Sequence, residues 1–348
     1  MSSGDSRPGP ADSAEAGAAE AATPPPPPRR VLALINPNAG RFEPNRLMEW
    51  ITEGAEELDA DITFVVIEPG ERMRDFTARA ALDGYELVLV AGGDGTLAEA
   101  AAGLVGSALP MAIIPAGTGN ILATNLNVPF GIREATLAAL QGAAAPFDVG
   151  RLDDGRIFLL AAGAGYDADL IRDADRELKR WLGPVAYIVS MFRNLRAKHG
   201  RFNVELDGWQ RIRINARTVL VCNAGRTLGS IPLAPDADLG DGWLDLVIFR
   251  FRNPLALFGI FLTAIFRGLK KDPRVQFFRA RRIRIQASRP MPVQVDGDFI
   301  DRTTPIEMTI LPGALQVVRP PHAPPFDLSR LTEDALKALR QVTTPPSH

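Results

Sequence analysis

The sequence predicts an α/β protein whose N-terminal domain contains a parallel sheet and whose second domain is mostly β. Two patterns support this. Between residues 31 and 114, continuous runs of β-branched residues and leucine alternate with segments of helical periodicity, which is typical of a parallel sheet covered on both faces. After about Asp148, short apolar runs follow one another without obligatory crossover helices. The length of 348 residues allows two substantial cores.

The first domain is expected to alternate strictly between strands and helices. The expected strands are Val31–Ile35, Ile62–Ile67, Leu87–Ala91 and Met111–Ile114, and the expected helices are Asn45–Glu57, Met73–Leu82 and Leu97–Leu104. In an open parallel sheet, ligands bind beyond the carboxyl ends of the strands. A ligand site is therefore expected in the turns that follow these strands.

The second domain is expected to contain six strands and two helical stretches. The strands are Ile157–Ala162, Phe202–Leu206, Ile212–Val221, Trp243–Phe249, Arg282–Gln286 and Met291–Val295, and the helical stretches lie near 170–198 and 254–271. The resulting domain bounds are 30–148 and 149–320, and the end of the second domain is expected to return to the first.

Two tails flank these domains. Residues 1–29 are rich in Ala, Gly, Ser and Pro and lack apolar periodicity, so we expect a disordered tail. Residues 321–348 form a C-terminal tail that contains one short amphipathic helix, Leu328–Leu339. No function follows from either tail.

The composition narrows the class of protein. Apolar residues make up 46 % and charged residues 23 %, as in globular proteins, and a formal net charge of −2 argues against nucleic-acid binding. The single cysteine, Cys222, excludes an internal disulfide and is more consistent with a small buried residue than with a catalytic thiol. There is no signal peptide pattern and no apolar run of about 20 residues. We expect a soluble, cytoplasmic protein.

The turn Gly92-Gly93-Asp94-Gly95-Thr96 follows a buried strand and precedes an alanine-rich helix. Three glycines remove the Cβ atoms that would keep a ligand from the backbone, and amides at the helix N-terminus favour an anion. Thr96 could donate a hydroxyl or cap the helix. Asp94 suits an anion site only with a divalent cation between it and the phosphates. The competing interpretation is an ordinary turn with Asp94 as a cap.

Two further polar turns follow other strands of the same predicted sheet. Asn36-Pro37-Asn38-Ala39-Gly40 follows the first strand, and Gly117-Thr118-Gly119-Asn120 follows the fourth. Each alone is an ordinary turn composition. Together they predict three glycine turns at one edge of the sheet, which indicates phosphate binding.

A fourth element, Asp296-Gly297-Asp298, ends a strand late in the β domain. Two acids around a glycine are usually a polar hairpin turn. The alternative is a general base, because a hydroxyl that accepts a phosphoryl group must be oriented and relieved of its proton.

In this order, these four elements resemble the diacylglycerol kinase catalytic-domain family, and within it the bacterial lipid kinases related to sphingosine and ceramide kinases. The resemblance covers roughly residues 31–320. Gly163–Ala168 is similar to the glycine-rich strand that opens the family's second domain, and residues 235–245 resemble its P-x-A-x-x-x-D-G-x-L-D signature. The fold implied is that of NAD kinase and diacylglycerol kinase.

The resemblance implies roles for individual residues. Asp94 would hold a magnesium–phosphate network, and Asp296 or Asp298 would activate the lipid hydroxyl. ATP would be surrounded by three turns and the segment around Glu68–Met73, that is by Asn36, Pro37, Asn38, Ala39, Gly40, Glu68, Gly70, Glu71, Gly92, Gly93, Asp94, Gly95, Thr96, Gly117, Thr118, Gly119 and Asn120.

Related bacterial kinases also bind a structural Mg²⁺ through ligands spaced 0, +3 and +5, which here are Asp238, Asp241 and the Trp243 carbonyl. The competing interpretation of these acids is a turn before a strand. The chain departs from the family at three positions. Asp298 replaces the usual glutamate, Ile121 replaces an aspartate, and Glu71 stands where some relatives have aspartate.

The implied function is transfer of the γ-phosphate of ATP to a lipid hydroxyl, with diacylglycerol as the first expectation and Mg²⁺ as cofactor. The alternatives are a sphingosine or ceramide kinase, an NAD kinase, and a regulator without catalysis. Residues 250–284 contain ten Lys or Arg and one acid around the uncharged stretch 253–266. This region predicts peripheral contact with the inner membrane face, unless the stretch is a core helix. A homodimer is left open.

Overall fold

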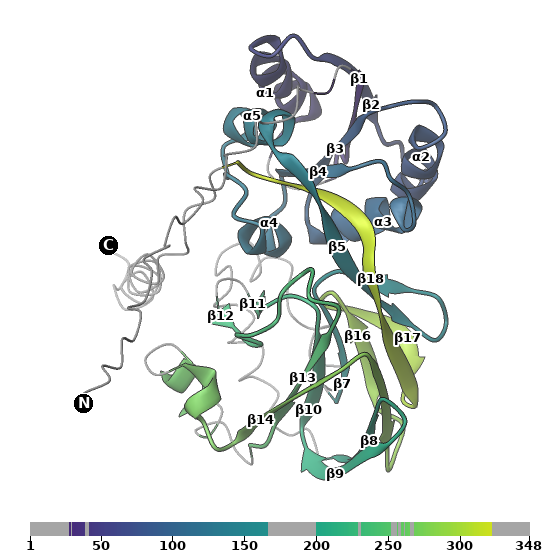
Figure 1. The fold of residues 1–348 in the computed structure, drawn as a ribbon, viewed down its shortest axis with the longest axis vertical. Helices are drawn as coiled ribbons and strands as arrows, with labels where there is room; N and C mark the ends of the chain where they lie inside the picture. The colour runs from purple at the N-terminus through teal and green to yellow at the C-terminus, as the bar shows by residue number, and fades with distance from the viewer. Residues whose placement is uncertain are drawn as a thin grey trace, which may run out of the picture.

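The computed structural model describes residues 28, 30–38, 42–165, 200–228, 231–251, 256, 259–260, 262–264 and 268–321. It shows an N-terminal α/β part and a second, mostly β part (Figure 1). The predicted fold class is confirmed. The predicted tail 1–29, the helical stretch near 170–198 and the helix Leu328–Leu339 lie outside the described residues, apart from residue 28.

Four parallel strands begin the larger sheet in the order β2-β1-β3-β4. They are β1 (Arg30–Ile35), β2 (Asp61–Val66), β3 (Leu87–Gly92) and β4 (Met111–Pro115). The central strands β3 and β4 are buried at every residue, which explains their unbroken apolar sequences.

Helices cover both faces of these strands (Figure 1). Helices α1 (Pro44–Glu56) and α5 (Ile132–Gln141) pack together on one face, and α2 (Met73–Ala80) and α3 (Asp94–Leu104) pack together on the other. The short helix α4 (Ile121–Asn125) follows β4. This layering places the ends of the four strands at one open edge.

The same sheet continues into the second part of the molecule. Strand β18 (Ile306–Arg319) runs along β5 (Ala143–Leu152) and meets β4 at the pair Val317–Met111 (Figure 1). Beyond β18 the sheet adds β15 (Arg282–Ala287), β8 (Gly200–Leu206) and β9 (Gln210–Ala216), and β6 (Ile157–Phe158) pairs with β5. The two parts therefore share hydrogen-bonded strands.

A second, antiparallel sheet packs on this continuation, with an apolar core between the two. Its order is β14-β13-β10-β7-β16-β17. The strands are β7 (Ala161–Ala164), β10 (Thr218–Cys222), β13 (Leu244–Phe249), β14 (Val275–Ala280), β16 (Pro292–Val295) and β17 (Asp298–Thr303). The second part also contains a separate two-stranded sheet of β11 (Arg226–Leu228) and β12 (Ile231–Pro232), and the 3₁₀ turn η1 (Leu269–Lys271).

Two predicted strands are wrong as single elements. The expected strand Ile212–Val221 is divided at Arg217 into β9 and β10, which belong to different sheets. The expected strand Ile157–Ala162 is interrupted at Leu159 and Leu160. In both cases, a segment that was predicted as one strand contains the point at which the chain passes from one sheet to the other.

The predicted helical stretch 254–271 is described only in part. Residues 256, 259–260 and 262–264 are helical, and Ile260 and Ala264 are buried in an apolar cluster with Phe251 and Val247. The described part therefore fits a core helix better than a membrane-facing one, although Leu262 remains 37 % exposed. None of the helices in the described ranges is long and apolar enough to cross a membrane.

Candidate functional site at the edge of the parallel sheet

Four polar turns follow the carboxyl ends of β1, β2, β3 and β4. Because Ile35 pairs with both Val66 and Ala91, and Gly92 pairs with Pro115, these strands end at the same level. The turns that begin at Asn36, Ile67, Gly93 and Ala116 therefore lie along one edge. Of the predicted nucleotide-binding residues, Ala39 and Gly40 fall outside the described residues.

The turns after β1 and β3 are joined by a hydrogen bond. The side-chain amide of Asn36 donates to the hydroxyl of Thr96 at 2.8 Å, and Asn36 Oδ1 accepts the amide of Asn38 at 2.9 Å. Thr96 lies within the first turn of α3, which begins at Asp94. Neither Thr96 nor Asp94 caps α3, since its N-cap residue is Gly93 and no side chain completes the cap.

The turns after β3 and β4 approach each other so closely that the position of Gly117 needs glycine. A Cβ atom on Gly117 would lie 2.4 Å from the Cα of Gly93, which no real contact allows. The exposed Gly95, in contrast, has open space around its Cβ position, with Asp298 Oδ2 at 4.0 Å. The edge thus combines two touching backbones with an open turn, an arrangement that leaves room for a ligand against bare main chain.

The turn after β2 is held by its own acid. Glu71 accepts the amide of Glu68 through Oε2 at 2.8 Å, while the Glu71 amide donates to the Glu68 carbonyl. Gly70 has a φ of 97°, which favours glycine. Glu71 therefore closes a local turn at the same sheet edge.

Asp94 is a helix cap, but of α4. Its Oδ2 accepts the amide of Ile121 at 3.0 Å and its Oδ1 accepts the amide of Leu122 at 2.9 Å. Asn120 just before has a left-handed φ of 49° and is buried, and its side chain bonds the backbone N–H and carbonyl of Gly117. The carboxylate of Asp94 is thus tied to the turn after β4.

The hairpin between β16 and β17 carries the predicted pair of acids, which have different environments. Asp296 accepts three backbone amides, from Leu159, Leu160 and Ala161, at 2.8–3.0 Å. Burial raises the pKa of Asp296 to about 6; the three amides act against this rise, and the negative charge of Asp94 adds to it. This carboxyl fixes the hairpin to the segment between β6 and β7.

Asp298 is exposed at the start of β17. Its Oδ2 is the nearest atom to the Cβ position of Gly95. The fold therefore brings an acid of the second domain over the glycine turn of the first, more than 200 residues away in sequence. The sequence pattern singled out both acids but could not place either.

The predicted structural metal set has other partners. Asp238 accepts the amide of Gly240, Asp241 accepts the amide of Trp243, and Asp241 also forms an ion pair with Arg279. In this arrangement the carboxylate of Asp241 therefore faces a guanidinium. The described residues contain no cluster of three or more His, Cys, Asp or Glu suited to a metal ion. The metal set stays a prediction.

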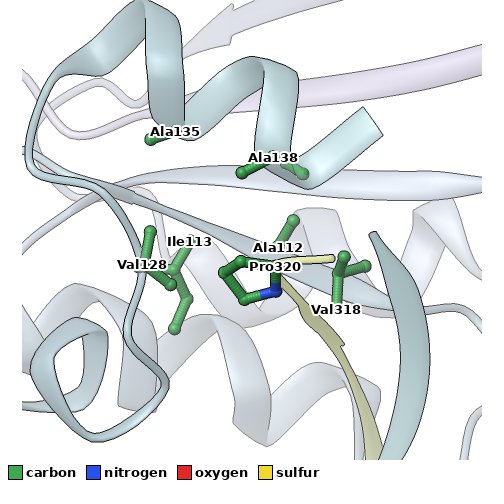
Figure 2. A pocket seen from close by; sticks show the side chains of 8 residues that line it. Ala112, Ile113, Val128, Ala135, Ala138, Val318 and Pro320 are labelled. Atoms are coloured by element: carbon green, nitrogen blue, oxygen red, sulfur yellow. The ribbon is translucent and has the colours of Figure 1, made fainter. Parts of the chain in front are cut away.

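A small pocket between α5, β4 and the end of β18 is a different kind of feature (Figure 2). Ala112, Ile113, Val128 and Val318 are among the residues that line it, and all of its lining side chains are apolar. A pocket lined by apolar side chains alone offers no charged or polar side chain that could orient phosphate or move a proton. We therefore assign the candidate site to the glycine turns and Asp298.

Comparison with known proteins places the chain in a family. Residues 30–152 match the diacylglycerol kinase catalytic domain, and residues 161–319 match the YegS C-terminal NAD kinase beta sandwich-like domain. Between them, these matches span most of the chain. It belongs to the diacylglycerol kinase and YegS-like lipid kinase family.

Individual relatives agree at modest identity. The chain is 29 % identical over 300 residues to a diacylglycerol kinase of Mycobacterium tuberculosis, covering 84 % of this chain and 96 % of that protein. It is 29 % identical over 278 residues to a diacylglycerol kinase of Bacillus subtilis, covering 78 % and 90 %. The crystal structure of a putative diacylglycerol kinase from Bacillus anthracis superposes with a TM-score of 0.73 at 26 % identity, covering 84 % and 97 %.

Proposed function

We propose that this protein transfers the γ-phosphate of ATP to the hydroxyl of a lipid, with diacylglycerol as the acceptor and phosphatidic acid as the product. The observation that carries the proposal is the position of Asp298 Oδ2 beside Gly95, which pairs a proton acceptor with an open glycine turn. Relatives named diacylglycerol kinase support the choice of acceptor.

The phosphate-binding step rests on the glycine turn. The exposed backbone around Gly95 at the start of α3 can donate amides to phosphate oxygens, and the helix dipole adds favourable charge. The bond between Asn36 and Thr96 holds this turn against the turn after β1. Positioning of this kind is most of what phosphoryl transfer requires from a protein, because its transition state is loose.

We assign the proton-accepting role to Asp298 and an anchoring role to Asp296. Asp296 already accepts three amides, so its carboxylate is fixed in place, whereas Asp298 is exposed beside the turn. In the proposed step the lipid hydroxyl gives its proton to Asp298 while its oxygen forms a bond to the γ-phosphorus. The bond between that phosphorus and the bridging oxygen breaks, and ADP leaves.

Mg²⁺ would bind where Asp94 and the phosphates meet, and it would offset their negative charges. Each oxygen of Asp94 accepts one amide, and a carboxylate has about four acceptor sites, so capacity remains on both oxygens. Mg²⁺ is usually held by one or two carboxylates together with substrate phosphates, so no preformed protein cage is needed. The residues around Asp94 fit this cation.

The proposed lipid acceptor requires contact with a membrane. Several basic residues of 250–284 are paired with acids, namely Lys270 with Asp236, Arg274 with Asp272, and Arg279 with Asp241 and Asp245. The exposed Arg250, Lys271 and Arg284 are candidates for contact with anionic lipid. Sedimentation with liposomes tests this, and equal binding to neutral and anionic vesicles would contradict the electrostatic part.

One assay separates the proposed function from its alternatives. Radiolabelled ATP is incubated with the protein, Mg²⁺ and, in turn, diacylglycerol, sphingosine, ceramide and NAD. We expect label in phosphatidic acid. Label in a sphingolipid or in NADP would show that the acceptor is not diacylglycerol. No transfer to any of the four compounds would favour a regulator without catalysis.

A further inference from the structure

The short helix α4 is held at its beginning by the candidate site. The amides of Ile121 and Leu122 donate to the two oxygens of Asp94, so the position of this carboxylate depends on the position of α4. Asp94 is also the residue expected to face the magnesium and the phosphates. Any displacement of α4 would therefore change the geometry of the proposed nucleotide site.

The end of α4 is held by the second domain. Asn125 accepts the backbone amide of Arg226 through Oδ1 at 3.0 Å and donates through Nδ2 to the Arg226 carbonyl at 2.7 Å. The side chain of Arg226 donates to the carbonyl of Thr124 at 2.8 Å. The side-chain amide of Asn125 thus makes the same pair of hydrogen bonds to the backbone of Arg226 that a neighbouring strand would make, and it connects α4 to β11.

The helix between these two contacts is short and firmly held. Asn125 Nδ2 also donates to the carbonyl of Ile121 at 2.9 Å, which ties the end of α4 directly to its beginning. Leu122 and Ala123 are buried, and the hydroxyl of Thr124 donates to the carbonyl of Asn120. At 1.5 Å per residue, only about 6 Å separates Ile121 from Asn125 along the axis. A body this short and this well bonded moves as a unit.

We propose that Asn125 is a positioning residue that couples the second domain to the nucleotide site, with α4 as the rigid link between Arg226 and Asp94. Asn125 is not one of the residues assigned to phosphate binding or to proton transfer. Its contribution is to set the place of the Asp94 carboxylate according to the place of β11, so that the domain expected to bind lipid and the site expected to bind Mg·ATP are adjusted together. This inference rests on the proposed function.

The main test is isothermal titration of the full chain with Mg·ATP and with ATP in EDTA, well below the melting temperature. Asn125→Ala removes all three side-chain bonds of Asn125. We expect the affinity for Mg·ATP to fall about tenfold, within the usual range of coupling between sites. The affinity for ATP in EDTA should stay at the wild-type value, because Asp94 acts through the cation. A role in stability alone would not separate these two titrations.

A second variant covers the case in which Asn125→Ala does not fold. Arg226→Met removes the bond to the Thr124 carbonyl but leaves the backbone of Arg226 in place for Asn125. It should lower the affinity for Mg·ATP by a smaller factor, about threefold. Asn215→Ala, at an exposed position of β9, is the matched control for loss of an amide and should titrate as wild type.

The outcomes are distinguishable from failure of the proposed function. If the wild-type chain does not bind Mg·ATP, the proposed function and the coupling are both wrong. If the wild type binds Mg·ATP and the folded variants bind it equally well, only the coupling is wrong. An equal loss of affinity with and without Mg²⁺ would also overturn the coupling, because the effect would not pass through Asp94.

Discussion

Two regions of the molecule are rich in acids, and the carboxylates have different kinds of partner in each. At the glycine turns, Asp94 and Asp296 accept backbone amides and Asp298 is exposed. In the segment 236–245, Asp236, Asp241 and Asp245 instead form ion pairs with the basic side chains of Lys270 and Arg279. Backbone amides hold the acids of the first region, whereas basic side chains of the protein offset part of the negative charge of the second.

The difference separates a candidate site from a structural cluster. An amide donor fixes a carboxylate without cancelling its charge, so neighbouring carboxylates oppose each other's ionisation, and part of the raised pKa of Asp296 comes from Asp94. Such a group of acids favours a cation brought by a ligand. An arginine among acids, as in the second region, needs no ligand. The following experiments test this distinction, in order of the expected effect on phosphate transfer.

The largest effect is expected for Asp298→Asn. Loss of the proposed proton acceptor should lower kcat by about 10²–10⁴-fold, while Mg·ATP binding stays near the wild-type value. Kinetic assay with diacylglycerol and calorimetry with Mg·ATP measure the two quantities. Asp301→Asn, an exposed acid on the same strand, is the control. Wild-type turnover by Asp298→Asn would remove Asp298 from the mechanism.

Two glycine variants distinguish a glycine that leaves space for a ligand from a glycine that is required by backbone packing. Gly95→Ala adds a methyl where the nearest atom is 4.0 Å away, so the fold should hold, but kcat/KM should fall about 10²-fold because the methyl points into the expected phosphate space. Gly117→Ala forces the two turns apart and should cost about 1–3 kcal/mol of stability. Thermal melts and kinetics of both variants test the contrast. Equal stability losses in both would refute it.

Asp296 should make stability depend on pH. Between pH 4 and 6 the folded chain keeps the proton of Asp296, whose pKa is raised to about 6, while the unfolded chain releases it. Stability should therefore fall as pH rises through this range, by at most about 3 kcal/mol from this group. Urea titrations of the wild type and Asp296→Asn compare the slopes. The same slope in both proteins would show that Asp296 has no raised pKa.

The smallest effect on transfer is expected in the ion-paired segment 236–245. Arg279→Met leaves Asp245 without its guanidinium partner and should cost about 1–2 kcal/mol of stability, since Arg279 itself is partly screened by solvent. The kcat with diacylglycerol should not change. A drop in kcat at full stability would show that this cluster takes part in the reaction.

The α/β part was largely predictable because its signals are local. Unbroken apolar strands such as Leu87–Gly92 and glycines directly after them are readable from spacing alone, and the turns do lie at one edge of the sheet. The touch between Gly117 and Gly93 follows from this placement. Parallel pairing then puts the turns together without further information.

The second part was harder because its contacts are distant in sequence. The division at Arg217 lies between two strands that follow each other directly and changes only which sheet the chain joins. Strands β5, β14, β17 and β18 were not predicted; β5 begins with three alanines, which carry no strand signal. The bonds of Asp94 to α4, and of Asn125 to Arg226, depend on tertiary placement and leave no pattern in the sequence.

The most direct measurement is a crystal structure of the protein with Mg²⁺ and a non-hydrolysable ATP analogue. We expect the triphosphate against the main chain of Gly92–Thr96, with Mg²⁺ between Asp94 and the phosphates and the carboxylate of Asp298 facing the γ-phosphate. A nucleotide bound elsewhere, or a glycine turn filled by the protein's own side chains, would contradict the proposed site.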